Sequence, residues 1–488
     1  MSVLKKNLSL QTAYQVLLVI TPLITAPYLA RKLGAEQLGV FSYTTSIVAY
    51  FTLIAMLGTI NYGTRSIAAA KGDRQKRNEI FTCVFLLQIS VTLIASIAYA
   101  VYLLFFCREN RVIAILQGIA LLSCLVDVTW LYFGVEDFLL TVTRSIIIKI
   151  ITIALILIFV RREADLWIYT LIMVGGSFAS NAVLFFCLSK YASFTKVSFS
   201  QIREHIKPNL ALFVPLLAMT VYHTMDKTML GALSDYDQSG YYYNSDKIIQ
   251  IPLVIISGIG TVMLPRMSSL LAEGKRREAD DLFMTTMEGV AAVGVAIACG
   301  IAAISNEFVP LFFGEGYEPC IILTIVLTPI FLFKGFSSIA RTQYLIPMKM
   351  EKEFTASVVG GAVVNLVLNL ILIPKYGALG AVIATVIAEL IACVLQLISL
   401  RSYNLGIGKL LLKTALYLAM GLTMVGIVRA VALLHINTVV KLVLEIVAGA
   451  SYFAAVCLFY WVKTRNRFYG ILIQPVVKRF KKTKSGGQ

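Results

Sequence analysis

Apolar runs of about twenty residues recur along the whole chain, and they limit what it can fold into. A bilayer has a hydrocarbon core about 30 Å thick, which one helix crosses with about 20 residues. These runs predict fourteen membrane-spanning helices, at residues 8–30, 40–62, 80–106, 112–133, 139–160, 166–188, 209–231, 241–263, 285–304, 320–339, 354–373, 377–400, 410–430 and 438–462. Lipid offers no partner for an unpaired backbone amide, and no alternating barrel pattern occurs. We therefore expect an all-α integral membrane protein with about 14 transmembrane helices.

The composition supports the same class. Charged residues make up 14% and hydrophobic residues 58% of the chain, whereas a soluble domain has roughly 25% and 45–50%. The net charge of +17 fits cytoplasmic loops and anionic lipid headgroups, because no basic stretch carries interleaved stacking aromatics for nucleic acid. The eight cysteines form no C-x-x-C motif, so we expect no disulfide framework and no zinc site.

Basic residues are distributed unevenly between the two sides of the predicted spans. Cytoplasmic loops collect Lys and Arg, and an N-terminus on the cytoplasmic side puts about three quarters of the 43 basic residues on that side. Arg144 and Lys149 count among these cytoplasmic charges. The bias predicts that both termini are cytoplasmic.

An internal repeat links the two halves of the chain. The basic loop that contains Arg65 matches a later one that contains Arg266, and upstream Gly39 matches Gly240 in the same register. Six spans separate the copies, which indicates a parallel repeat of the kind found in transporters. The predicted division is a six-helix lobe at 1–188, a cytoplasmic linker at 189–208, a second six-helix lobe at 209–408, two additional transmembrane helices at 409–462 and a basic cytoplasmic tail at 463–488.

Polar groups embedded in the spans are candidate functional residues, because they are costly in lipid and usually face a cavity or a partner. The candidates for ion coupling are Asp127, Asp226 and Glu389. Asn365 and Asn369 lie on one helical face, as do Ser123 and Asp127, and such stripes either line a cavity or join helices. A structural role is open too, since Asp226 could pair with Lys247.

Signatures of catalysis are missing from the sequence. The three histidines share no ligand spacing, and no nucleotide-binding loop or hydrolase motif occurs. We expect no enzyme activity, no cofactor and no metal site. Transport would then be driven by a gradient of H⁺ or Na⁺ or of the substrate itself.

Four stretches carry a family resemblance: PYLARKLGAEQLGVFSY from Pro27, MDKTMLG from Met225, GYYYNSDKI from Gly240, and PKYGALGAVIATVIAEL from Pro374. In combination they resemble the Wzx-type polysaccharide flippases of the multidrug/oligosaccharidyl-lipid/polysaccharide exporter superfamily. The resemblance covers essentially the whole chain.

The resemblance implies a bacterial inner-membrane protein that moves an undecaprenyl-diphosphate-linked oligosaccharide from the cytoplasmic to the outer leaflet by alternating access. It also implies membrane lipids, a polysaccharide polymerase and chain-length machinery as partners. Cationic groups lining a lumen would meet the diphosphate. The residues expected to do so are Arg65, Arg266, Lys334, Arg341, Lys227 and Lys247.

Two related functions stay open. A lipid II flippase of the same superfamily is one, and a cation-coupled multidrug exporter is the other. The exporter branch often binds its coupling cation with an acid in the first span, but residues 8–30 contain no Asp or Glu. A polymerase or glycosyltransferase would need a large outer loop, which the predicted spans do not leave.

Overall fold

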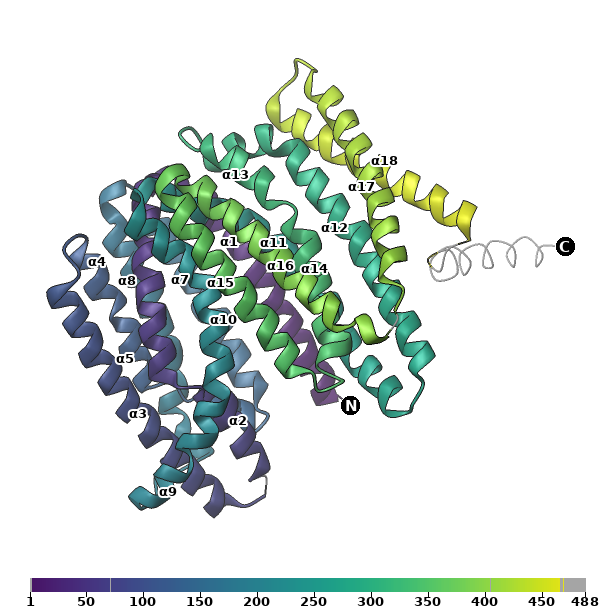
Figure 1. The fold of residues 1–488 in the computed structure, drawn as a ribbon. Helices are drawn as coiled ribbons and strands as arrows, with labels where there is room; N and C mark the ends of the chain where they lie inside the picture. The colour runs from purple at the N-terminus through teal and green to yellow at the C-terminus, as the bar shows by residue number, and fades with distance from the viewer. Residues whose placement is uncertain (1, 71, 404, 466–467, 469–488) are drawn as a thin grey trace. The chain divides into compact units, whose positions relative to one another are not determined.

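The computed structural model describes residues 2–70, 72–403, 405–465 and 468, and all regular structure in this part is helical (Figure 1). The α-helices are α1 (Ser2–Met56), α2 (Thr59–Ala69), α3 (Arg74–Phe105), α4 (Arg111–Gln117), α5 (Ile119–Leu125), α6 (Thr129–Gly134), α7 (Phe138–Phe159), α8 (Leu166–Phe186), α9 (Phe199–Glu204), α10 (Ile206–Leu233), α11 (Tyr236–Ala272), α12 (Arg276–Phe313), α13 (Pro319–Leu327), α14 (Ile330–Ala340), α15 (Glu351–Tyr376), α16 (Ala378–Ser399), α17 (Ile407–Ala432) and α18 (Thr438–Thr464). The all-α prediction is confirmed. Most of the predicted basic tail lies outside the described residues.

The number of membrane-crossing helices differs from the expected fourteen. Among the described residues, twelve helical segments are long and apolar enough to cross a bilayer. The predicted span 8–30 falls in α1, and the predicted span 40–62 runs from α1 into the start of α2. Helix α1 is helical on either side of Gly34 (φ 76°, ψ 173°). The predicted span 209–231 falls in α10, which is not among the twelve. The count of fourteen is therefore not confirmed.

One pair of helices begins at positions that match in the predicted repeat. Helix α3 begins at Arg74 and α12 begins at Arg276, at matching positions of the two halves. A glycine with positive φ precedes each start, Gly72 at 94° and Gly274 at 73°. Both chain reversals need the left-handed backbone that glycine adopts at little cost.

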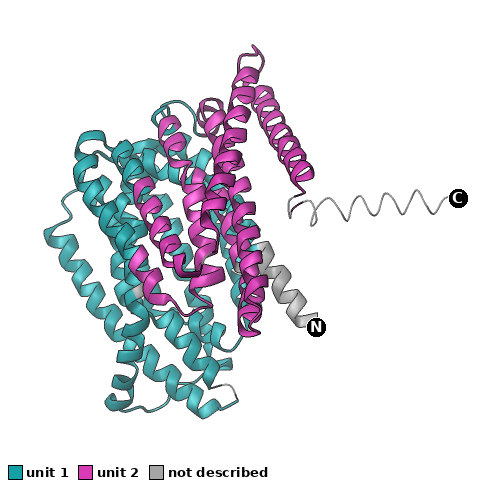
Figure 2. Ribbon diagram, turned by 45° about the vertical axis from the view of Figure 1, so that its right-hand side comes forward, with its two compact units in different colours: residues 1–247, 313–320, 358–385 teal, residues 248–312, 321–357, 386–488 magenta. Residues whose placement is uncertain are grey.

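The described chain forms two compact units (Figure 2). Unit 1 contains residues 1–247, 313–320 and 358–385, and unit 2 contains 248–312, 321–357 and 386–488. Unit 1 contains residues of both predicted lobes, whereas unit 2 contains none of residues 1–188. The division into two six-helix lobes stays a prediction.

In unit 1, the predicted span 112–133 is broken into α4, α5 and α6. Gln88 on α3 supports the second break, because its Nε2 donates to the carbonyl oxygens of Cys124 (2.7 Å) and Asp127 (2.8 Å). The Gln88 Oε1 accepts a hydrogen bond from the buried Trp130 indole at 3.0 Å. The expected helical stripe of Ser123 and Asp127 is wrong, because Asp127 lies in the irregular segment between α5 and α6.

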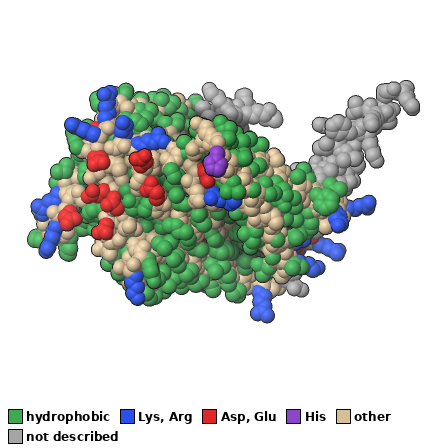
Figure 3. All heavy atoms as spheres, turned by 90° about the horizontal axis from the view of Figure 1, so that it is seen from above, with side chains coloured by type: hydrophobic (Ala, Val, Ile, Leu, Met, Phe, Trp, Pro, Cys, Tyr) green, Lys and Arg blue, Asp and Glu red, His purple; other side chains and the backbone are tan. Residues whose placement is uncertain are grey.

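Many large apolar side chains remain exposed on the outer helix faces. On α3, for example, Ile97 and Leu104 are both 67% exposed, and Phe105 is 72% exposed. The space-filling view shows broad areas of hydrophobic side chains, with the charged ones gathered in patches (Figure 3). Surfaces this apolar are unfavourable in water and fit contact with lipid.

Candidate functional site

The predicted site residues fall into both units. Unit 1 contains Arg65, Asp127, Asp226, Lys227, Lys247, Asn365 and Asn369, and unit 2 contains Arg266, Lys334, Arg341 and Glu389.

A cavity of about 130 Å³ lies within unit 1, between α1, α7, α8 and the first turns of α11. Its lining consists of Thr21, Pro22, Thr25, Lys149, Thr152, Ile153, Ile156, Tyr169, Met173, Tyr243 and Lys247. Two lysines thus face one cavity, and no carboxylate is among the lining residues. The cavity is suited to an anionic group.

Neither cavity lysine is neutralised by an acid within the described residues. The Lys247 Nζ lies 4.0 Å from the centre of the Tyr243 ring, and Lys149 is close enough to feel the charge of Lys247. Lys227 is not among the lining residues; its Nζ lies 5.8 Å from the centre of the same ring and forms a salt bridge with Asp246 at 3.1 Å. Two like charges in one half-buried cavity repel each other, so a bound anion would stabilise both.

Three threonines complete the polar part of the cavity lining. The hydroxyls of Thr21, Thr25 and Thr152 each donate to a carbonyl oxygen of their own helix, at 2.7, 2.9 and 2.8 Å. Their oxygens keep free lone pairs and can accept. The cavity therefore offers ammonium donors for an anion and hydroxyl acceptors for a group such as a sugar hydroxyl.

Asp226 on α10 is the centre of a second polar cluster in unit 1. Its Oδ2 accepts from the Tyr242 hydroxyl at 2.7 Å and the Thr385 hydroxyl at 2.8 Å, and its Oδ1 accepts from the Asn369 Nδ2 at 2.6 Å. The same Asn369 nitrogen donates to the Asn365 Oδ1 at 3.2 Å. The Asp226, Asn365 and Asn369 side chains are all buried.

The Asp226 cluster corrects one expectation and extends another. A pairing of Asp226 with Lys247 is wrong, since neighbouring polar side chains hold both carboxylate oxygens. The predicted stripe of Asn365 and Asn369 is present on α15, and it joins this helix to α10. Asp226 accepts from two hydroxyls and one amide nitrogen. The same hydroxyls and the amides of this cluster also carry oxygen atoms, which a hard cation prefers as ligands.

In unit 2, Lys334 on α14 forms a salt bridge with Glu389 on α16 at 3.2 Å. The two side chains are 23% and 7% exposed. Arg341 begins a π-helical turn, Arg341–Leu345, at the end of α14, and its guanidinium lies 5.8 Å from the centre of the Phe354 ring. The sequence predicted substrate contact for Lys334 and ion coupling for Glu389, whereas the structure brings the two side chains together as an ion pair.

The remaining predicted residues lie apart from these groups. Arg65 on α2 and Arg266 on α11 are both exposed. The Asp127 Oδ1 accepts a hydrogen bond from the Thr129 backbone amide at 2.9 Å. This contact gives Asp127 a local role in starting α6.

Sequence reasoning missed Lys149 and the two cavity tyrosines, Tyr169 and Tyr243. Lys149 was assigned to the cytoplasmic charges, but it lies near the middle of α7, about 16 Å along the helix from its first residue. That position corrects the assignment. Its place inside an apolar run was the signal that could have found it.

Within the part of the chain that the structure describes, no three His, Cys, Asp or Glu side chains gather in a way that could hold a metal ion. The candidate sites are a dicationic cavity and a buried carboxylate that accepts three hydrogen bonds.

Solved structures with the same fold are membrane transporters. A structure of the lipid II flippase MurJ in an inward closed conformation superposes with a TM-score of 0.71 at 14% identity, covering 93% of this chain and 100% of that one. An inward-facing MATE family multidrug resistance transporter of the MOP superfamily gives 0.62 at 13% identity, covering 80% and 94%. The chain is therefore a multi-pass α-helical membrane protein with the fold of this superfamily.

The family follows from the sequence comparison. The model of the family described as "Polysaccharide biosynthesis protein" matches residues 4–271, more than half of the chain. The chain belongs to this family, and the resemblance to Wzx-type flippases is confirmed.

Named relatives agree with this family. A protein of Escherichia coli K12 named "Putative O-antigen transporter" is 24% identical over 79% of this chain and 93% of its own length. A Haloferax volcanii protein named "Probable low-salt glycan biosynthesis flippase Agl15" is 22% identical over 77% and 79%. The lipid II flippase MurJ of Bacillus subtilis is 24% identical over 41% and 37%.

Proposed function

We propose that this protein is a flippase for lipid-linked oligosaccharides, which carries undecaprenyl-diphosphate-linked repeat units from the cytoplasmic to the outer leaflet of a bacterial inner membrane. The observation that carries the proposal is the dicationic cavity of unit 1 in a chain of the polysaccharide biosynthesis family. Two relatives that match over 93% and 99% of their own length carry the name "Putative O-antigen transporter".

The cavity lysines fit a diphosphate headgroup. Lys149 and Lys247 each present an ammonium with three donors, and no lining carboxylate competes for them. Charge-assisted hydrogen bonds to phosphate oxygens are short and strong. The sugar would lie against the threonine oxygens and the tyrosines, while the lipid tail stays in the bilayer. Lys334, Arg341, Arg65 and Arg266 would meet the substrate elsewhere along its path.

The Asp226 cluster is the candidate site for a coupling cation. A Na⁺ ion held by the Asp226 carboxylate, the Thr385 hydroxyl and the amide oxygens of Asn365 and Asn369 would be neutralised by one carboxylate. Its binding would turn the Asn369 amide, so that its oxygen replaces its nitrogen beside Asp226. A proton on Asp226 is the alternative form of coupling. Either cation would remove the charge that now accepts three hydrogen bonds, and it would thereby change how α10, α11, α15 and α16 are held together.

The remaining parts of the proposal concern the cell. Both termini would be cytoplasmic, as the distribution of Lys and Arg predicts. A polysaccharide polymerase and the chain-length machinery would receive the translocated product. We propose no enzymatic step, because the named relatives act as transporters or flippases.

A lipid II flippase is the second candidate, favoured by the TM-score of 0.71 with MurJ. Reconstitution in vesicles separates the two. Substrates to compare are an undecaprenyl-diphosphate oligosaccharide, lipid II and a cationic dye, each scored by its exposure to an added sugar-modifying enzyme or quencher. We expect oligosaccharide transfer above that of empty vesicles. Transfer of only lipid II, or of only the dye, would refute the proposal.

A further inference from the structure

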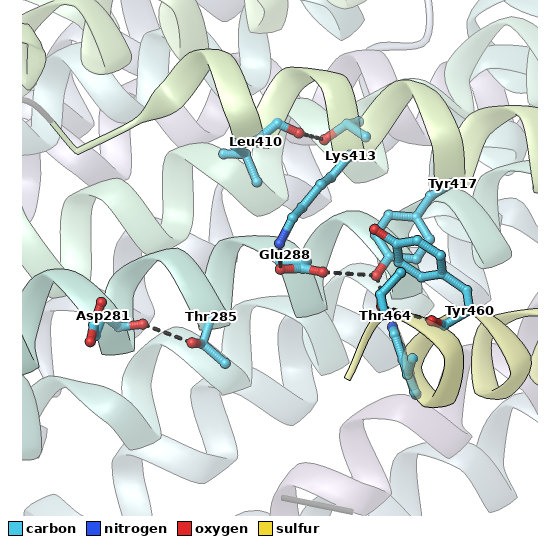
Figure 4. A network of polar contacts seen from close by, with 10 residues as sticks. Asp281, Thr285, Glu288, Leu410, Lys413, Tyr417, Tyr460 and Thr464 are labelled. Carbon is cyan, nitrogen blue, oxygen red and sulfur yellow. Dashed lines mark hydrogen bonds and ion pairs between the residues drawn. The ribbon is translucent and has the colours of Figure 1, made fainter. Parts of the chain in front are cut away.

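In unit 2, two separate polar contacts join the last two helices to α12. Figure 4 shows the first contact, where Glu288 on α12 accepts from the Lys413 Nζ at 2.6 Å and from the Tyr417 hydroxyl at 3.1 Å. The Tyr417 oxygen in turn accepts from the Trp461 indole on α18 at 2.9 Å. Glu288 is thus a buried carboxylate with a partner for each oxygen.

The second contact lies near the end of α12. Glu307 forms a salt bridge with Arg429 on α17 at 3.1 Å. The same Arg429 nitrogen donates to the Ala303 carbonyl oxygen at 3.2 Å. Here one carboxylate and one guanidinium already neutralise each other.

A third acid lies beside this pair. Glu445 on α18 is 0% exposed, and neither of its carboxyl oxygens has a hydrogen-bond partner among the described residues. The charged groups that reach it are Glu307 on α12, Arg429 on α17 and Lys441 one turn earlier on α18. Among the salt bridges of the described residues, none joins Glu445 to either of the two bases.

An ionised Glu445 in this position would be expensive. A buried carboxylate without a hydrogen bond is strongly destabilised in its charged form, and Glu307 adds repulsion from a like charge. A proton on Glu445 removes both costs. The contrast with Glu288, which has a donor for each oxygen, shows what an ionised acid in these helices requires.

We propose that Glu445 is a proton-binding site of the last two helices. It holds a proton while Arg429 pairs with Glu307, and its deprotonated form competes with Glu307 for Arg429. Loss of the proton would loosen the end of α12 from α17, while the Glu288 contact stays in place. The proposal depends on contacts within unit 2 and stands independently of the transported substrate.

Infrared spectroscopy of the full-length protein in lipid nanodiscs tests this site. We expect wild-type protein at neutral pH to show the carbonyl stretch of a protonated carboxylic acid, and Glu445→Gln to lose that band. The control Glu315→Gln, which changes an exposed acid, should keep it. A spectrum in which Glu445→Gln removes no band at neutral pH would overturn the proposal.

A second variant keeps the test decisive if Glu445→Gln does not fold. Glu307→Gln frees Arg429 to pair with Glu445, so the protonated band should disappear although Glu445 is still present. Its persistence would contradict the competition for Arg429. Amide hydrogen exchange tests the consequence: residues 303–312 should exchange faster as Glu445 loses its proton in wild-type protein, and a pH-independent rate would overturn the release of α12.

Discussion

Gly39 on α1 and Gly240 on α11 pack against each other reciprocally within unit 1. A Cβ on Gly39 would lie 1.7 Å from the Tyr236 carbonyl oxygen, and a Cβ on Gly240 would lie 1.9 Å from the Ala35 carbonyl oxygen. These are matching positions of the predicted internal repeat, so the two predicted copies meet through equivalent backbone positions. Only glycine allows two helices to approach this closely.

Replacing either glycine should separate these helices. We expect Gly39→Ala and Gly240→Ala each to destabilise the protein by about 1–3 kcal/mol, as overpacking does. The thermal unfolding midpoint in detergent measures this. The matched control is Gly175→Ala on α8, where nothing lies within 4 Å of an added Cβ. Equal midpoints for Gly39→Ala and Gly175→Ala would contradict the close crossing.

Removing the cavity charges should weaken transport without unfolding the protein. Lys149→Gln and Lys247→Gln each delete one ammonium that would meet the diphosphate, and charge-assisted contacts contribute about 1.5–3 kcal/mol. We expect at least a tenfold loss of oligosaccharide translocation in vesicles for each variant. Lys207→Gln, which changes an exposed lysine of the same unit, should transfer normally. Normal transfer by the double variant would remove the cavity from the mechanism.

The Asp226 cluster should bind a cation, and this binding should require the oxygen ligands of the cluster. We expect Na⁺ to raise the unfolding midpoint of wild-type protein relative to choline, because a ligand that binds the folded state stabilises it. Asp226→Asn and Thr385→Ala should abolish this rise. Equal unfolding midpoints in Na⁺ and choline would contradict Na⁺ binding and favour proton coupling instead. The effect of an imposed pH gradient on translocation would then test proton coupling.

Removing one member of the salt bridge between Lys334 and Glu389 should lower the stability of the protein. Lys334→Ala leaves a buried carboxylate without its cation, which costs about 3–5 kcal/mol. We expect lower stability for this variant and its recovery when Glu389→Gln is added. A Lys334→Ala protein with wild-type stability but no transport would instead assign Lys334 to the substrate alone.

His205, between α9 and α10, should make the stability of the protein depend on pH. The Tyr62 hydroxyl lies 2.6 Å from the His205 Nδ1, and burial lowers the pKa of His205, against the opposing charges of Glu204 and Glu79. As the pH is lowered, His205 therefore takes up a proton in the unfolded chain before it does so in the folded protein, near the ordinary histidine pKa of about 6.5. Stability should fall as the pH drops below that value and stay constant above it.

Thermal unfolding over a pH series checks the His205 prediction. His205→Gln should flatten the acidic limb of the midpoint curve. The exposed His435 provides the control, and His435→Gln should keep the wild-type curve. An unchanged acidic limb in His205→Gln would assign the pH dependence to other groups.

Much of the fold could be predicted because membrane helices are specified locally. Spans such as 139–160 and 438–462 agree closely with α7 and α18, since a run of apolar residues must match the bilayer thickness. The prediction failed where the chain departs from one uninterrupted helix per span. Asp127 lies in a break between two short helices that Gln88, on another helix, supports through hydrogen bonds.

The sequence by itself determined the membrane class, most helix positions and the family, because each depends on run length or on short motifs. Only the tertiary structure decided the partners of the embedded charges: Asp226 with Asn369, Thr385 and Tyr242, and Lys334 with Glu389. It also moved Lys149 from a presumed cytoplasmic end into a cavity. Which faces of distant helices meet depends on the packing of whole helices, and that information is spread over many weak contacts between segments far apart in the chain.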